Sequence, residues 1–339
     1  MSENEEEILK AALKLSFAEQ CQHAHWKVRS RAYEMLSSSF DDEKDEKETT
    51  NDKNFEINYF KEAMHKIVSE TNANALDVAL ERANQRLRKM IDRELVSFTS
   101  SSREGVKGVK EFAEDVGAKV LPALVSKAFF GRPKAVSFAT ETFCLFVEME
   151  QSELAIEVLS KASGHKVPKV ALAASKCLAL ACEQFGCGKR GALNWMKCLD
   201  GAKEAIGHRD EKVRNEGKRV IVECAKWVGD QVVMEKMKDK LSKTMKGEVE
   251  ASLAKETADG KERGSMKATR FLISLQKEMR TKKTTTSTSE GSKEDSVTEK
   301  VEAVAGADDL NEDPYDSAEP FSVLKALDKP STDEDIPKF

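Results

Sequence analysis

The chain has 339 residues, of which 40% are hydrophobic and 6% aromatic, and its 55 Lys and Arg against 60 Asp and Glu leave a net charge of −5. At roughly 150 residues per domain, this length allows two domains or one elongated array. No run approaches the ~18 uncharged apolar residues of a membrane span, and the first residues, MSENEEE, are acidic where a secretory signal would be basic and then apolar. We therefore expect a cytosolic or nuclear protein whose seven cysteines are reduced thiols, most of them packed as small apolar side chains.

The charge is divided unevenly along the chain. Residues 281–339 carry 7 Lys and Arg against 15 Asp and Glu, a net of −8, so residues 1–280 carry +3. Two short acidic stretches, 1–7 and 41–53, each contribute −4, which leaves +11 on the remainder. A basic body with acidic tails predicts an acidic partner, which is a protein, a nucleic acid or an anionic lipid.

Apolar residues recur with a helical period from about Ile8 to Arg280. In 137–147 and 170–182 they stand at i, i+3, i+4 and i+7, on faces wide enough to be buried on both flanks. No long stretch alternates with period two, and many of the 17 Gly and 7 Pro fall between helical runs. The pattern predicts an all-α protein with short, regularly placed connections.

The connections recur with similar chemistry, which indicates an internal repeat. Four helix starts place a Lys one or two residues before a Val, at Lys27, Lys134, Lys169 and Lys212. The spacing is 35 residues from Lys134 to Lys169 and 43 from there to Lys212. HEAT and armadillo solenoids repeat a helix pair every ~40 to 47 residues, so the length predicts a solenoid of about six repeats.

Three segments do not fit the repeat. The acidic, Asn- and Thr-rich stretch 41–53 is expected to be a solvated loop inserted among the first repeats. Residues 281–312 are rich in Ser, Thr and Glu and low in hydrophobicity, which predicts a disordered acidic linker. Residues 313–339 regain an apolar helical pattern where no further core exists to receive it.

The four repeated lysines are predicted to lie in the first turn of a helix. Free N–H groups already carry partial positive charge there, so a cation is unfavourable by ~0.3 to 1 kcal/mol. Equivalent turns of a solenoid line one side, so the repetition predicts a basic strip that faces an acidic partner. The alternative is that exposed lysines only keep this edge soluble.

A structural alternative also stays open for the helix-start arginines. Arg29 and Arg214 have the position at which HEAT repeats often pair an arginine with an aspartate of an adjacent turn. Asp210 is the expected partner of Arg214. Such a pair would stabilise the turns as a ladder of ion pairs instead of binding a partner.

The three tryptophans are expected to differ. Trp26 follows Gln-His-Ala-His directly before a helix start, and an exposed aromatic at a turn is the residue type most enriched at interface hot spots. The alternative is that Trp26 packs over the preceding helix and staples its own turn. Trp195 and Trp227 lie within long amphipathic segments and are expected in the core.

No catalytic or metal-binding set is recognised. Cys21 and the two histidines that follow it have spacings that suit a metal, but no fourth ligand accompanies them. Cys177, Cys182 and Cys187 are five apart, so on a helix they would turn away from one another and form no ligand cluster. No nucleophile, base and orienting acid occur as a recognisable set. We therefore expect a protein that is not an enzyme and that has no metal and no cofactor.

Several motifs, in order and at matching spacing, resemble the TOG (tumour-overexpressed-gene) domains of microtubule polymerases, and specifically the first TOG domain. The segment from His25 to Leu36 resembles the family's first turn and following helix. The segments around Lys169 and from Asp210 to Trp227 resemble its fourth and fifth turns, and KATRFL at 267–272 is similar to the segment that closes the domain.

The resemblance implies a domain organisation. Residues 1–280 would form the TOG domain with its insert at 41–53, and 281–312 would be the linker. Motifs such as DPYD and the final IPKF make 313–339 look like the lead-in to a second TOG domain, which is missing, so the chain is expected to be a fragment.

The resemblance also implies a flat paddle of six HEAT repeats whose intra-repeat turns bind curved, unpolymerised αβ-tubulin along one edge. Trp26 would insert against β-tubulin, with the turns of repeats two and three alongside. The fourth and fifth turns would meet acidic tubulin surfaces. The residues expected to make contact are Trp26, Lys27, Asn72, Asn74, Arg132, Lys134, Lys166, Lys169, Lys212 and Arg214.

A domain of this kind would capture tubulin dimers for a polymerase that promotes plus-end growth, in the cytoplasm and on microtubules, spindle poles, centrosomes or kinetochores. It would use no membrane and no small-molecule substrate. Two other classes stay open. A HEAT-type adaptor would bind peptides or subunits on its inner helical face. Nucleic-acid binding by the basic body is disfavoured, because few residues are aromatic and the lysines sit in narrow turns without stacking side chains.

Overall fold

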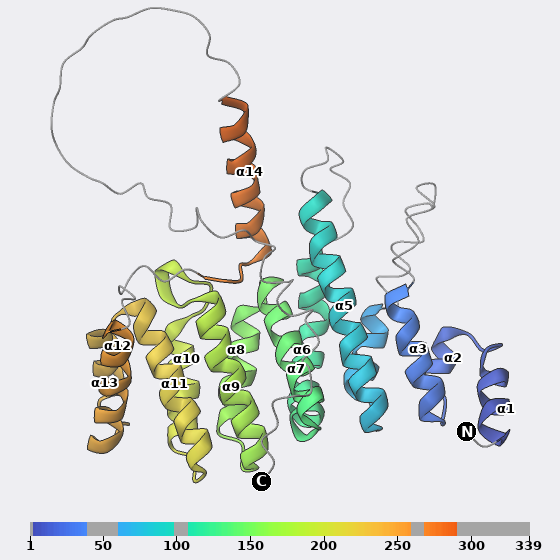
Figure 1. Ribbon diagram of the computed structural model, residues 1–339, viewed down its shortest axis with the longest axis horizontal. Coiled ribbons are helices and arrows are strands. Elements are labelled where there is room, and N and C mark those ends of the chain that lie inside the picture. The colour runs from blue at the N-terminus through green and yellow to red at the C-terminus, as the bar shows by residue number, and fades with distance from the viewer. Residues whose placement is uncertain (1–2, 39–59, 98–107, 259–267, 290–339) are drawn as a thin grey trace, which may run out of the picture.

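The computed structural model describes residues 3–38, 60–97, 108–258 and 268–289, and these ranges are mostly helical (Figure 1). Within them, the one extended pairing is an isolated bridge between Cys187 and Leu193. None of the described helices combines the length and apolarity needed to cross a membrane. The insert 41–53 and the expected lead-in 313–339 lie outside the described residues. The all-α prediction is confirmed for the part of the chain that the structure describes.

The helices follow one another as antiparallel pairs along a row, after a short N-terminal helix, α1 (Glu3–Ala12). The first helices of the pairs are α2 (Phe17–Cys21), residues 60–68, α6 (Val109–Lys127), α8 (Ser152–Ser163), α10 (Trp195–Ile206) and α12 (Asp230–Met237). The second helices are α3 (Trp26–Ser38), α5 (Ala73–Ser97), α7 (Pro133–Glu148), α9 (Pro168–Phe185), α11 (Glu211–Val228) and α13 (Lys243–Ala258). Two 3₁₀ turns, η1 (Ala128–Phe130) and η2 (Gly188–Arg190), and a final helix, α14 (Ile273–Ser289), complete the described elements.

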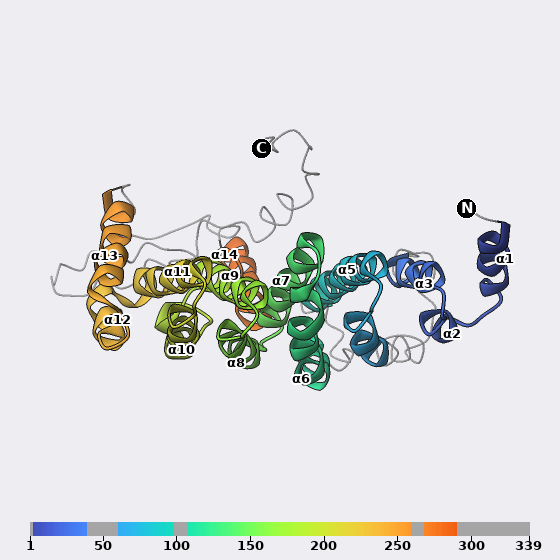
Figure 2. The same cartoon turned by 90° about the horizontal axis from the view of Figure 1, so that it is seen from below.

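The helices form two layers. Figure 2, which shows the row from below, places α3, α5, α9 and α11 in one line and α8 and α10 in a second line beneath it. Helix α9 contacts α7, α8 and α11, and α10 contacts α8 and α11, so each pair packs on the next. This is the architecture of a HEAT-type solenoid, and the prediction of a flat array of six helix pairs is confirmed for the described residues.

Helix α9 shows why this sequence packs as a solenoid. Its neighbours flank it on both sides, and 11 of its 18 residues are buried, most of them small. Small side chains let neighbouring helices approach closely. The same device operates at Gly201 on α10, where a Cβ atom would lie 2.9 Å from the Cα atom of Ser160 on α8. The wide buried faces predicted from the apolar spacing are confirmed here.

A buried ion-pair cluster fastens residues 268–272 to the middle of the array. The Arg270 side chain is 8% exposed, and its guanidinium donates to both carboxylate oxygens of Glu141 at 3.0 and 3.2 Å and also pairs with Glu148. The backbone N–H groups of Thr269 and Arg270 donate to the Gln184 carbonyl at 2.9 and 3.0 Å. Arg270 therefore holds a segment that follows α13 against α7 and the end of α9.

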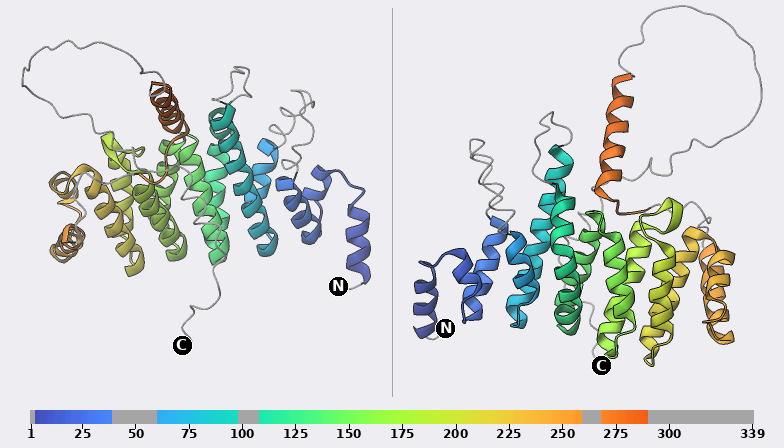
Figure 3. Two further views of the ribbon diagram at one scale, coloured as in Figure 1. Left: turned by 45° about the horizontal axis from the view of Figure 1, so that its top comes forward. Right: turned by 180° about the vertical axis from the view of Figure 1, so that it is seen from behind.

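Helix α14 departs from the sequence prediction. It rises away from the array in both views of Figure 3 and continues to Ser289, so residues 281–289, expected in the disordered linker, are helical. Lys277 anchors the helix by an ion pair with Glu94 on α5 at 2.7 Å. The Thr281 hydroxyl donates to the Lys277 carbonyl one turn back at 2.7 Å, which gives this polar side chain a partner inside the helix.

Four cysteines converge at the edge where α9 ends, which corrects an expectation. Their Sγ atoms lie within 4.8 Å of one another and all are buried: Cys182, Cys187, Cys198 and Cys224. The expectation that Cys182 and Cys187 turn away from each other and join no ligand cluster is wrong, because it assumed one continuous helix. Helix α9 ends at Phe185, and Gly186, with a φ of 70°, redirects the chain.

Candidate functional site

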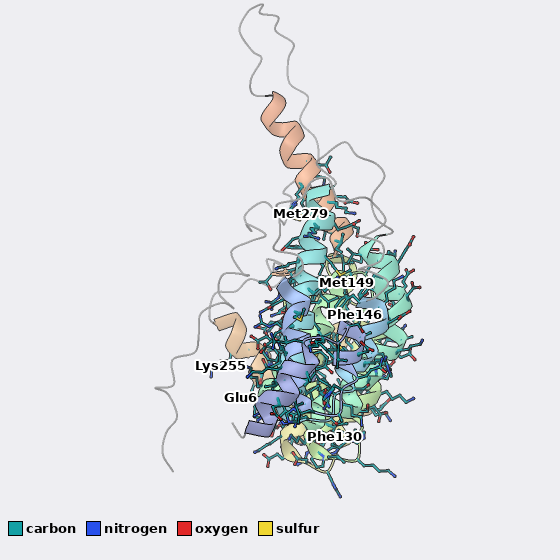
Figure 4. The ribbon with its side chains drawn as sticks, turned by 90° about the vertical axis from the view of Figure 1, so that its right-hand side faces the viewer. Glu6, Phe130, Phe146, Met149, Lys255 and Met279 are labelled. Carbon is teal, nitrogen blue, oxygen red and sulfur yellow. The ribbon has the colours of Figure 1, made fainter. Side chains whose placement is uncertain are left out.

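The connections within the helix pairs all lie at one edge of the array, the lower edge in Figure 1. We call this surface the turn edge and define it by the first five connections with the first residues of the helices that follow: 22–27, 69–74, 130–134, 164–169 and 207–212. Figure 4 shows Phe130 at this edge and Met149 and Met279 toward the opposite one.

Three turns share a histidine that holds the backbone. His23, His165 and His208 each stand three residues before the first residue of the following helix. The Nδ1 atom of each ring accepts a hydrogen bond from the backbone N–H two residues later, at 3.0, 3.1 and 3.0 Å. In the second turn Glu70 takes the same place, and its Oε1 atom accepts the N–H of Asn72 at 2.8 Å. This device was not predicted, although the constant spacing before each helix start is visible in the sequence.

An arginine at the fourth residue of α3 and of α11 closes the turn from the helix side. The Nη1 atom donates to the carbonyl oxygens six and five residues earlier, at 2.8 and 2.9 Å for Arg29 and at 3.1 and 2.7 Å for Arg214. The first and fifth turns are therefore built in the same way, and each guanidinium binds backbone groups of its own turn.

The expected ion pair between Arg214 and Asp210 is wrong, because each side chain binds backbone groups instead. The Asp210 carboxylate is the N-cap of α11 and accepts the N–H groups of Lys212 and Val213 at 2.9 and 3.4 Å. A short acidic side chain accepts hydrogen bonds from the free N–H groups at a helix start. The Asp210 carboxylate makes these bonds in place of an ion pair with Arg214. Arg214 thus has a structural contact, made with carbonyl oxygens.

The predicted lysines share one helical register. Lys27, Lys134, Lys169 and Lys212 are each the second residue of their helix, α3, α7, α9 and α11, and Asn74 has the same place in α5. Their predicted position in the first helical turn is confirmed. The side chains of Lys134, Lys169 and Lys212 are exposed, and that of Lys27 is half-buried. Because these helix starts lie along one edge, the residues form a row on it.

Part of this row is engaged within the chain. The Lys134 Nζ atom lies 3.5 Å from the Glu81 carboxylate, and that of Lys169 donates to the Phe130 carbonyl at 3.1 Å. The exposed side chains of Lys166 and Lys212 make no ion pair or hydrogen bond with the residues that the structure describes. The fourth and fifth turns therefore offer the most available cations.

The candidate residues of the second and third turns bond to one another. The Nη2 atom of Arg132 donates to Asp77 Oδ2 at 2.7 Å and to Asn74 Oδ1 at 2.9 Å. The Asn72 Oδ1 atom accepts the N–H groups of Asn74 and Ala75 at 3.0 and 3.2 Å, as a cap of α5 does. These contacts order the start of α5, while 48% of the Arg132 side chain stays exposed.

Trp26 is half-buried and packs against the hydrophobic core, and its remaining surface lines a shallow hollow with Leu9 of α1 and Arg31 of α3. The Lys27 Nζ atom lies 5.8 Å from the centre of its ring. The packing of Trp26 against the core fits a residue that staples its own turn, and its exposed surface fits a residue that contacts a partner. Trp195 and Trp227 are also only partly buried, so they lie at the margin of the core and not within it.

Three further side chains of the turn edge were not predicted. Phe130 is 44% exposed and meets the His165 ring edge-on at 5.7 Å, and Val167 is 37% exposed. Arg209 is exposed in the fifth turn, and its Nη2 atom donates to the Lys166 carbonyl of the fourth turn at 3.5 Å. Phe130 stands three positions before the start of α7, and an aromatic residue at this position could have indicated an exposed side chain in the turn.

Metal-ligating groups gather elsewhere. The His23 Nδ1 atom is occupied by its backbone hydrogen bond, and Cys21 is buried. Among the described residues, the four-cysteine cluster is the one place where three or more Cys, His, Asp or Glu ligand atoms come together. It lies at the edge opposite the turn edge, because α9 and α11 end there and start at the turns.

Residues 12–253 match a family model described as XMAP215/Dis1/CLASP, TOG domain. The chain is 29% identical over 330 residues to the protein MOR1 of rice, Oryza sativa subsp. japonica, and 26% identical over 327 residues to the protein mini spindles of Drosophila melanogaster. These alignments cover 97% and 93% of this chain but 14% and 13% of the relatives. The chain therefore spans about one seventh of their length.

Solved structures give the same architecture. One, of microtubule polymerases with TOG domain arrays that recruit and assemble tubulin, superposes with a TM-score of 0.61 at 18% identity and covers 78% of this chain and 50% of that chain. The N-terminal domain of MAST/Orbit superposes with a TM-score of 0.54 at 15% identity and covers 71% and 96%. At such identities the likeness shows the fold.

Proposed function

Since the chain belongs to the XMAP215/Dis1/CLASP family of TOG domains, we propose that it binds αβ-tubulin through its turn edge. In the finer form of the proposal, it captures curved, unpolymerised dimers as the first TOG domain of a microtubule polymerase that promotes growth at plus ends. The observation that carries the proposal is the row of cations that occupies one helical register along this edge.

The charge of the fourth and fifth turns supports an acidic partner. Lys166, Lys169, Arg209 and Lys212 are all exposed there, and Glu211 is the exposed acid among them. A lysine at the second helical position opposes the helix dipole by ~0.3 to 1 kcal/mol, so the repeated choice favours a use outside the helix. A surplus of positive charge on one edge attracts an acidic surface and orients its approach.

Apolar side chains on the same edge add contact area. Phe130 and Val167 are exposed on the third and fourth turns, and Trp26 is half-buried at the first. Aromatic anchors beside cations are typical of the residues that contribute most to binding. The proposed orientation sets Trp26 against β-tubulin and the fourth and fifth turns against acidic surfaces of the dimer, mainly on the α-subunit for the fifth.

Binding alone is the proposed activity, with no bond made or broken. In a polymerase, the chain would work in the cytoplasm on microtubules, at spindle poles, centrosomes or kinetochores. The relative named mini spindles and the structural neighbour described as a microtubule polymerase support this setting.

Gel filtration of the 339-residue chain with unpolymerised tubulin tests the proposal. At low salt the two should elute together, and a Lys169→Glu/Lys212→Glu variant should bind at least about tenfold more weakly, a loss of roughly 1.4 kcal/mol. Lys119→Glu is the matched control, because this exposed lysine lies in the middle of α6, away from the turn edge. Added salt should weaken the wild-type complex, since 0.1 M salt screens charges beyond about 10 Å.

Two outcomes oppose the proposal. Separate elution at low salt would remove tubulin binding. Equal binding by the charge-reversed variant or by a Trp26→Ala/Lys212→Ala variant would remove the turn edge as the site. If Lys176→Glu on the exposed face of α9 weakened binding instead, the helical face would be the binding surface, as in a HEAT-type adaptor.

A further inference from the structure

The four-cysteine cluster is assembled by four neighbouring segments. One cysteine each comes from the end of α9, the α9–α10 connection, the start of α10 and the end of α11: Cys182, Cys187, Cys198 and Cys224. The connection is held by its own backbone, with the Ala192 N–H donating to Phe185 at 3.1 Å and the Gly188 N–H donating to Leu193 at 3.0 Å. The positions of the sulfur atoms are therefore set by the packed fold.

The size of the cluster suits a single metal ion. All four sulfur atoms lie within 4.8 Å of one another, and those of Cys187 and Cys224 are 4.0 Å apart. A zinc ion about 2.3 Å from four thiolates sets the sulfurs about 3.8 Å apart, so the longest separation needs to shorten by at most about 1 Å. An iron–sulfur cluster holds its thiolates farther apart, because several metal and sulfide atoms lie between them.

The ligand type and the burial point to a closed site. Four thiols are the only ligand atoms in the group, and all four side chains are 0% exposed. Soft thiolates select zinc over magnesium and calcium, and four protein ligands without an open position are typical of structural zinc. Cys144 and Cys177 are as deeply buried but stand outside the group, so packing as small apolar side chains accounts for them.

Packing around the cluster excludes water. A Cβ atom at Gly186 would lie 2.8 Å from the Trp227 ring, so the indole presses directly on the connection that carries Cys187.

We propose that the four-cysteine cluster binds one zinc ion and that this ion is a structural crosslink between the fourth and fifth helix pairs. Each thiol loses its proton to solvent as its sulfur binds the metal, so four thiolates surround the ion. The crosslink joins α9, α10 and α11 at the edge opposite the turn edge. The zinc ion would stabilise α9 and α11, which carry Lys169 and Lys212 at their first turns, without contacting a partner bound at the turn edge.

Metal analysis of the 339-residue chain is the first test. Purified under reducing conditions without a chelator, the chain should contain one zinc per molecule by mass spectrometry of its metals. Replacement by cobalt should give the charge-transfer and visible bands of a tetrahedral tetrathiolate. Removal of zinc by a strong chelator should lower the melting temperature by roughly 5 °C or more, and added zinc should restore it.

Variants separate this site from the other cysteines. Cys198→Ala and Cys224→Ala should each reduce bound zinc to less than a tenth of the wild-type content, whereas Cys177→Ala, also buried on α9, should retain it. If the cluster variants do not fold, the metal content and cobalt spectrum of the wild-type chain decide the question.

Three results would overturn the proposal. One is a folded, fully reduced wild-type chain with less than a tenth of an equivalent of metal and no cobalt spectrum. Another is a stoichiometric disulfide between Cys187 and Cys224 in the freshly isolated protein. The third is equal zinc content in Cys177→Ala and the two cluster variants. None of these depends on tubulin binding, which is measured separately.

Discussion

Arg29 and Glu70 form a two-point ion pair that links the first two turns of the array. Nε of the arginine donates to Oε2 and Nη2 donates to Oε1, both at 2.7 Å, and the Glu70 side chain is only 2% exposed. The Tyr33 hydroxyl and the backbone N–H groups of Thr71 and Asn72 also donate to this carboxylate, at 2.8 to 2.9 Å. Glu70 is thus the acceptor that holds the first repeat against the second turn.

This pair predicts an acid-sensitive contribution to stability. Burial alone would raise the pKa of Glu70, but the hydrogen bonds from Arg29, the Asn72 N–H and Tyr33 outweigh it and lower the pKa to about 2. The unfolded carboxyl has a pKa of about 4.3, so the folded state binds fewer protons between these values. A contribution of about 3 kcal/mol should be complete above about pH 5 and lost as the pH falls toward 2.

Urea unfolding of Glu70→Gln across this range measures the effect. The variant should be less stable by about 3 kcal/mol at pH 7 and should lose less of its stability between pH 5 and 2 than the wild type. Glu235→Gln is the control, because that side chain is 74% exposed. Identical pH profiles for the wild type and Glu70→Gln would contradict the assignment.

Alanine variants of Arg214 and Lys212 should affect different properties, the stability of the fold for Arg214 and the binding of tubulin for Lys212. Arg214→Ala removes the two hydrogen bonds to the carbonyls of its own turn and should reduce the free energy of unfolding by about 1 to 3 kcal/mol. Lys212→Ala removes an exposed side chain and should change it by less than about 0.5 kcal/mol while weakening tubulin binding. Unfolding and gel filtration on both variants check this. Unchanged stability with lost binding in Arg214→Ala would make it a contact residue instead.

Phe130 should contribute to binding and little to folding. Because 44% of its side chain is exposed at the turn edge, Phe130→Ala should weaken tubulin binding about tenfold and leave the fold intact. Titration of labelled tubulin measures the affinity. Val232→Ala is the matched control, since this side chain is 48% exposed on α12 outside the turn edge. Equal effects of the two changes would argue against a specific role for Phe130.

The helical repeat and the lysine register could be predicted from the sequence because both are local. Apolar spacing, Pro133 and Pro168 at helix starts, and the Asp210 cap each act within a few residues of backbone. The histidine turns are local as well, because each histidine stands three residues before a helix start, and this spacing is visible in the sequence.

The partners of those residues could not be predicted. Arg29 meets Glu70 across 41 residues, and Arg132 meets Asp77 across 55, through contacts between neighbouring repeats. The half-burial of Trp26 depends on how the core packs against it. Each of these contacts is selected by which helix faces lie together, and a helical period does not specify that.

An all-α array of helix pairs with a lysine at repeated helix starts thus follows from the amino-acid sequence alone, since backbone hydrogen bonding and chain breaks act over short range. The packing of the helices against one another sets which cations are paired and which are available. It also brought Cys198 and Cys224 to Cys182 and Cys187, because the end of α9, the return of the chain through Gly186 and the packing of α10 and α11 together define that one point in space.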